Sequence, residues 1–102
     1  MNKDWKDVRK LIEYPKEGIL SKVLISVDGF NLTLFCMAKG SEMTEHTSTK
    51  RGTIHVLEGD GIFVLEGKKI KMKKDALIYM DKDAKHSLKA KKNTSFLLSL
   101  SK

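Results

Sequence analysis

Residues 40–61 read Gly40-Ser-Glu-Met-Thr-Glu-His46-Thr-Ser-Thr-Lys-Arg-Gly52-Thr-Ile-His-Val-Leu-Glu-Gly59-Asp-Gly61. Two runs of strand-forming residues, 53–58 and 62–66, flank the turn Gly59-Asp60-Gly61, whose glycines tolerate positive φ. Ahead of them, residues 41–48 alternate less cleanly between apolar and polar side chains. The pattern predicts two strands joined by a tight turn and preceded by a less regular strand.

The same pattern extends in both directions along the chain. Asp28-Gly29 is a hairpin turn between two runs of β-forming residues, and Ile70 and Met72 alternate with lysines after Gly67. About nine short strands with almost no helix predict an all-β sandwich or barrel. The expected strands cover residues 19–27, 30–38, 41–48, 53–58, 62–66, 69–73, 76–80, 86–90 and 94–100.

One short helix is expected, at the N-terminal end. Residues 4–14 carry apolar side chains at helical spacing: Trp5, Val8, Leu11 and Ile12. Asp4 is expected to cap the first turn, Pro15 to end the helix, and Trp5 to anchor it by packing. The predicted organisation is a helical arm over residues 1–17 and a single barrel domain over residues 18–102.

Composition places the chain among globular proteins. It has 102 residues, of which 40% are hydrophobic and 32% charged. No apolar run approaches the length of a membrane span, and the hydrophilic first residues predict no secretory signal, so no membrane partner is expected. The single cysteine, Cys36, has no partner for an internal disulfide, and a reducing, cytoplasmic setting is therefore expected.

The net charge of +7 is unevenly distributed. Residues 1–67 hold 9 basic and 10 acidic side chains, whereas residues 68–102 hold 11 and 3. Of the 20 basic residues, 18 are lysines, and no aromatic residue lies among the lysine clusters to stack on bases. This composition favours a solvated strand face, and nucleic acid is not expected as a partner.

The strand over residues 30–38 is apolar on both faces. Leu32, Leu34 and Cys36 alternate with Phe35 and Met37. A strand of this kind is usually buried on both faces. A second copy in a symmetric dimer would cover the outer face, and the alternative is that the N-terminal helix covers it. The dimer is the favoured interpretation.

Three histidines, one cysteine and scattered carboxylates make up the reactive side chains. Gly40, His46 and the run Val56–Gly61 resemble the first conserved motif of the cupins. Residues 75–90 align with the second motif, with His86 at its histidine but Asp75, Asp81, Asp83 and Ala90 at its Gly, Pro, Gly and Asn positions. The chain resembles the small single-domain cupins over roughly residues 18–101. The resemblance implies a double-stranded β-helix, the cupin or jelly-roll barrel, and a homodimer.

The sequence departs from the cupin pattern at the metal ligands. Cupin metal sites typically use two histidines and a glutamate from the first motif and one histidine from the second. His46 and His86 stand at two of these four positions, but Ser48 replaces the second histidine and Gly52 the glutamate. The resemblance therefore implies a degenerate site, with no certain cofactor beyond a weakly bound divalent metal ion at His46 and His86.

The expected site is a ligand pocket inside the barrel, widened where Ser48 and Gly52 replace larger residues. Alternation along residues 52–56 points Gly52, Ile54 and Val56 inwards and His55 outwards, so His55 is excluded. Cys36 or Met43 would join the site only if its strand faced the same cavity. The pocket is assigned to His46, Ser48, Gly52, Ile54, Val56 and His86.

Three functions remain open at this point. The favoured one is a non-catalytic barrel that binds or senses a small-molecule ligand, in which the metal site is degenerate. The second is a metal-dependent cupin oxygenase or isomerase that uses His46 and His86, with no catalytic residue assigned. The third is an interaction module that uses the lysine-rich edge of the barrel.

Overall fold

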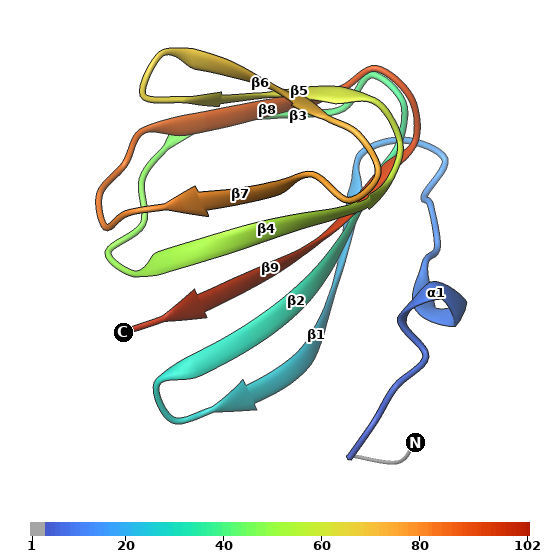
Figure 1. Ribbon diagram of the computed structural model, residues 1–102. Helices are drawn as coiled ribbons and strands as arrows, with labels where there is room; N and C mark the ends of the chain where they lie inside the picture. Colours follow the sequence, from blue (N-terminus) through green and yellow to red (C-terminus); the bar gives the residue numbers. More distant parts are fainter. Residues whose placement is uncertain (1–3) are drawn as a thin grey trace.

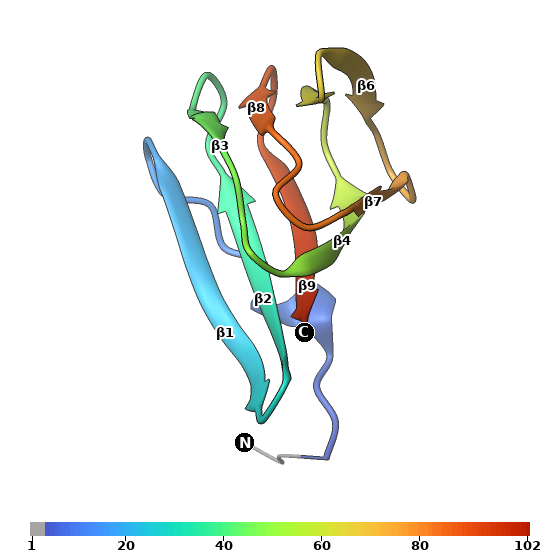
Figure 2. The same cartoon turned by 90° about the vertical axis from the view of Figure 1, so that its left-hand side faces the viewer.

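The computed structural model describes residues 4–102, and within them the chain forms two antiparallel sheets that face each other (Figures 1 and 2). The five-stranded sheet has the order β1 (Ile19–Val27), β2 (Phe30–Met37), β9 (Thr94–Ser101), β4 (Arg51–Glu58), β7 (Leu77–Met80). The four-stranded sheet has the order β3 (Glu42–His46), β8 (His86–Ala90), β5 (Gly61–Leu65), β6 (Lys68–Met72). The predicted β-rich architecture is confirmed.

The strand boundaries follow from turn chemistry. Gly29, Gly59 and Gly67 all have positive φ, as the predicted turns require. At Gly59 the turn also passes so close to the last strand that a Cβ would lie 2.4 Å from Thr94 Oγ1. The less regular alternation before residue 48 corresponds to a register shift in β3 between Met43 and His46.

The core lies between the two sheets. Met37, Val56, Phe63, Met72 and Phe96 are at most 1% exposed and belong to one cluster of buried side chains. Phe63 and Met72 alternate with more exposed residues on their strands, whereas Met37, Val56 and Phe96 each have a buried neighbour on the opposite face: Cys36, Leu57 and Ser95. This cluster fixes the distance between the sheets and forms the floor of the site described below.

The N-terminal helix is shorter than predicted. It covers only Val8–Leu11 as α1, with Asp7 rather than Asp4 at its N-cap. The backbone is already extended at Ile12, well before Pro15, and the next amide, that of Glu13, donates to Cys36 Sγ at 3.5 Å. Contacts with the barrel thus replace the hydrogen bonds of a longer helix.

The arm covers the outer face of β2, which decides between the two alternatives stated for that strand. Leu34 and Cys36 are fully buried on this face, and their cluster is completed by partly buried side chains of the arm: Val8, Leu11, Ile12 and Tyr14. Figure 1 shows the arm running along the outside of this sheet. The apolar outer face of β2 is therefore satisfied within the chain and does not itself require a second copy.

Polar contacts fasten the arm to the end of β4. Tyr14 donates its hydroxyl to Glu58 at 2.8 Å, and Arg9 forms an ion pair with the same carboxylate at 3.5 Å. Burial, with the hydrogen bond and negative charge of Glu58, raises the pKa of Tyr14 to about 12. The phenol consequently remains a donor at neutral pH.

Trp5 is not the packing anchor predicted for the arm. Its side chain is 66% exposed and lies near Leu24, Ile25 and Leu32 at the side of the five-stranded sheet. Val8, Leu11 and Ile12 bury the arm instead.

The described part of the chain contains no helix that is long and apolar enough to cross a membrane.

Candidate functional site

Strands β3 and β8 bring two histidines together. His46 ends β3, His86 begins β8, and the two residues are direct partners in the antiparallel ladder. Their ring centroids are 4.1 Å apart and the rings meet edge to face. A register shift in β3 directly precedes His46 and sets this pairing. The two histidines are forty residues apart, so the sequence alone does not show that they are ladder partners. The predicted meeting of His46 and His86 is thus present.

Each imidazole is oriented by a backbone carbonyl two residues earlier. His46 Nδ1 lies 2.7 Å from the Thr44 carbonyl oxygen, and His86 Nδ1 lies 2.9 Å from that of Ala84. Because a carbonyl oxygen only accepts, each Nδ1 carries the proton and donates it. In the neutral rings, Nε2 is therefore the nitrogen left with a lone pair for a ligand.

The two rings differ in environment. His86 is 6% exposed and stacks on Phe63 at 5.8 Å between centroids, whereas His46 is exposed at the rim. Burial lowers the pKa of His86, and the neighbouring His46 lowers it further, against an opposing hydrogen bond to Ala84. His86 is therefore a neutral imidazole at physiological pH.

His86 is expected to titrate below the ordinary value of 6.5. Between its folded pKa and 6.5, the unfolded chain binds this proton more tightly than the folded chain does, so the unfolding free energy falls as pH drops through that window. Above pH 6.5 the His86 ring is neutral in both the folded and the unfolded chain, so its titration no longer lowers the unfolding free energy. An NMR titration of the His86 Cε1 proton checks the pKa, and a midpoint at or above 6.5 would contradict the burial argument.

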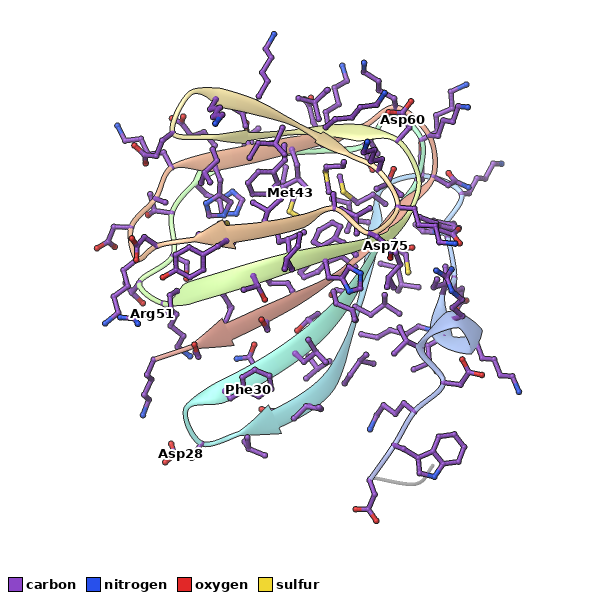
Figure 3. All side chains as sticks on the ribbon, viewed as in Figure 1. Asp28, Phe30, Met43, Arg51, Asp60 and Asp75 are labelled. Carbon is purple, nitrogen blue, oxygen red and sulfur yellow. The ribbon has the colours of Figure 1, made fainter. Side chains whose placement is uncertain are left out.

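The rings border a small apolar cavity between the sheets, here called the imidazole hollow. Its volume is about 80 Å³. Met43, labelled in Figure 3, lies at its wall. Of the predicted pocket residues, Ile54 lines the hollow together with the two histidines. The remaining walls come from core strands whose alternation could have indicated them: Phe35, Met80, Leu88, Phe96 and Leu98.

Three predicted pocket residues lie outside the imidazole hollow. Val56 is fully buried in the core but does not line it. Ser48 uses its hydroxyl to accept the amide of Lys50 at 3.1 Å. At Gly52 a Cβ would lie 2.8 Å from both the Leu100 side chain and the Ser99 carbonyl, so the space of a larger residue is already filled. The expected widening of the pocket at Ser48 and Gly52 is not found.

The remaining reactive residues lie elsewhere. His55 is on the outer surface, where its Nε2 lies 3.3 Å from Asp75, as strand alternation predicted. Cys36 is buried under the arm, whereas Met43 faces the hollow. No cluster of three or more histidine, cysteine, aspartate or glutamate side chains with metal-binding geometry occurs within residues 4–102. Two imidazoles are the whole set of strong ligands at this site.

The family model for the Cupin domain matches residues 33–100, a span that includes both imidazoles. The chain belongs to the cupin family. Its all-β barrel with a short helix is the cupin fold, as the resemblance in the sequence implied. No curated protein matches the chain in a sequence search.

Several solved structures superpose closely on this one. A conserved protein of unknown function from Streptococcus pyogenes is 21% identical, with a TM-score of 0.86 over 96% of this chain and 86% of its own. A cupin superfamily protein from Desulfitobacterium hafniense is also 21% identical, with a TM-score of 0.85 over 90% and 84%. A cupin 2 conserved barrel domain protein from Leptotrichia buccalis is 25% identical, with a TM-score of 0.85 over 92% and 46%. At such identities, these likenesses establish the fold and leave function to the site.

Proposed function

We propose that this cupin is a non-catalytic barrel that binds or senses a small-molecule ligand at the imidazole hollow. The observation that carries the proposal is the contact between His46 and His86 over an apolar cavity, with both Nδ1 atoms engaged by carbonyls. Nε2 of each ring is left as an acceptor, on the exposed His46 at the rim and on the buried His86 further in, and the other walls are hydrocarbon and thioether. This combination suits an amphipathic ligand.

The size of the hollow narrows the ligand class. Its 80 Å³ is about half the volume of an engineered cavity of roughly 150 Å³ that takes up benzene. A ligand therefore inserts only a short aliphatic group past the rings. Its polar part stays at the rim beside the exposed His46, where a hydroxyl or amine would donate to Nε2.

The alternative function, a metal-dependent cupin oxygenase or isomerase, is less well supported by the residues present. The orientation of each Nδ1 toward a carbonyl is typical of metal-binding histidines and is compatible with weak binding of a divalent metal ion. Catalytic divalent sites, however, use three or more protein ligands. Two imidazoles do not fit such a site, and no catalytic step is assigned to them.

The binding proposal is tested by NMR titration of the full chain with isobutanol, using its methyl ether as a matched probe without a donor. Isobutanol is expected to give saturable shifts of the His86 ring and of the Ile54 and Leu98 methyl groups. The ether is expected to bind more weakly because it cannot donate to Nε2. Linear shifts spread over the whole surface, with no saturation at the hollow, would contradict the proposal.

We propose that the barrel forms a homodimer through the free edge of β1. This strand is the outermost of its sheet, and it leaves Val23, Ile25 and Val27 at least 40% exposed. An exposed apolar edge favours pairing with another strand. Light scattering after size exclusion is expected to show a dimer for the native chain and a monomer for Ile25→Lys. A native species of 11.6 kDa would overturn the proposal.

The cytoplasm is the proposed location. The support is chemical: Cys36 is buried and unpaired under the arm, where it behaves as a small apolar side chain. Such a thiol needs no oxidising compartment.

A further inference from the structure

A large concavity of the barrel lies away from the imidazoles and is lined by several lysines. Lys39, Lys71, Lys73 and Lys92 surround a hollow of about 660 Å³, here called the lysine hollow, together with Gly59, Asp60 and Asn93. Lys39 precedes β3 and Lys92 follows β8, whereas His46 and His86 lie at the other ends of these strands. The two hollows are therefore at opposite ends of the barrel. Asp60, labelled in Figure 3, marks the lysine end.

Hydrogen bonds hold the rim of the lysine hollow in place. The amides of Lys91 and Lys92 donate to the Asp60 carbonyl at 2.8 and 3.1 Å, and the Asp60 amide donates to Thr94 Oγ1 at 3.1 Å. The loop that contains Lys39 is bound to the loop that contains Asn93, because the Lys39 amide donates to Asn93 Oδ1 at 2.9 Å. These contacts connect three loops that are distant in sequence into one frame.

The lysines around this frame are not neutralised. Lys71 on the edge strand β6 and Lys73 directly after it flank the fully buried Met72, and both are exposed. None of the four lysines takes part in the ion pairs formed within residues 4–102. Asn93 uses only its oxygen for the loop contact, which leaves its amide NH₂ as a further donor. Four ammonium groups and one amide therefore face one concave surface that contains a single carboxylate.

We infer that the lysine hollow is a binding site for a small, multiply charged phosphate ester. Lysines bind phosphate oxygens as point charges, and the volume is that of a small-molecule site. No aromatic side chain lines the hollow, so it lacks the stacking surfaces that single-stranded nucleic acid requires. Asp60 interrupts the positive charge and would accept a hydrogen bond from a hydroxyl group of the ester.

Inorganic pyrophosphate is the probe, titrated calorimetrically into the full chain at about 0.1 M ionic strength, where a Debye length of about 10 Å screens the lysines outside the hollow. Saturable binding of one pyrophosphate per chain is expected. The double variant K71Q/K73Q should weaken it by at least about tenfold, because two charged donors are lost. The matched control K68Q/K69Q removes the same charge from the same strand outside the hollow and should change the affinity by less than about twofold.

Asp60→Asn is expected to bind pyrophosphate several-fold more tightly, since a like charge is removed from the hollow. Unchanged or weaker binding by this variant would contradict the placement of the carboxylate at the ligand.

Three results would overturn the site itself. Pyrophosphate binding without saturation is the first, and equal losses in the two double variants, which indicate a diffuse surface field, are the second. The third is tighter binding of an oligothymidylate with the same sensitivity to K71Q/K73Q, because the surface would then be a nucleic-acid interface. Each of these results leaves the imidazole hollow unaffected, because the two sites share no residue.

Discussion

Replacing Phe96 by alanine is expected to lower the unfolding free energy by about 3–5 kcal/mol, the largest loss of stability predicted for this barrel. Phe96 is 1% exposed on β9, which lies in the middle of the five-stranded sheet. Its ring stacks on Phe35 at 5.2 Å and forms a wall of the imidazole hollow. The substitution removes these contacts and enlarges the cavity. Urea unfolding measures the resulting decrease in the unfolding free energy.

Leu77→Ala is the matched control, because Leu77 is 72% exposed on the edge strand β7. This variant should lower the unfolding free energy by no more than about 0.5 kcal/mol. If Phe96→Ala is too unstable for a full unfolding curve, benzene provides a second test. The enlarged cavity should bind benzene and raise the melting temperature of the variant, whereas the native chain should not respond. A loss below 1 kcal/mol without benzene binding would contradict the described core.

Zinc is expected to bind the native chain with a dissociation constant no tighter than about 1 μM. Structural zinc sites reach apparent binding free energies of about 10–16 kcal/mol with four protein ligands, and this site offers two imidazoles. His46→Ala and His86→Ala should each weaken the binding by at least about tenfold, because one ring alone is a poor chelator. Competition with a zinc-sensitive dye measures all three constants.

His55→Ala is the control for the zinc measurement, because His55 lies on the outer surface beside Asp75. Its removal should change the zinc dissociation constant by less than about twofold. Elemental analysis of protein purified without an affinity tag is the complementary experiment. Near-stoichiometric metal that survives chelator dialysis and disappears in His46→Ala would contradict the non-catalytic interpretation and support the oxygenase or isomerase.

The strands and the outward position of His55 were predictable because they depend on local chemistry. Glycine at positions 29 and 59 favours the positive φ of a tight turn, between the paired strands β1 and β2 at Gly29 and between the two sheets at Gly59. Alternation then assigns the faces of β4. The cupin resemblance followed from the same turns and from two histidine positions. These features need no information about distant parts of the chain.

The missed features all depend on contacts between distant residues. The space at Gly52 is filled by Leu100, which no pattern around residue 52 indicates. The arm ends its helix early because Glu13 bonds to Cys36. The lysine hollow is assembled from three loops, so the charge excess after residue 67 was visible in the sequence whereas its concave arrangement was not.

Both imidazoles donate through Nδ1 and so leave Nε2 to accept from a ligand. Long-range proton–nitrogen NMR correlation at about pH 8, above the ordinary histidine range, reads the tautomer of each ring directly. The predicted result is an Nδ1-protonated ring at both His46 and His86, with the two Nε2 resonances shifting together when isobutanol is added. An Nε2-protonated ring at either position, or shifts confined to His55, would contradict the account.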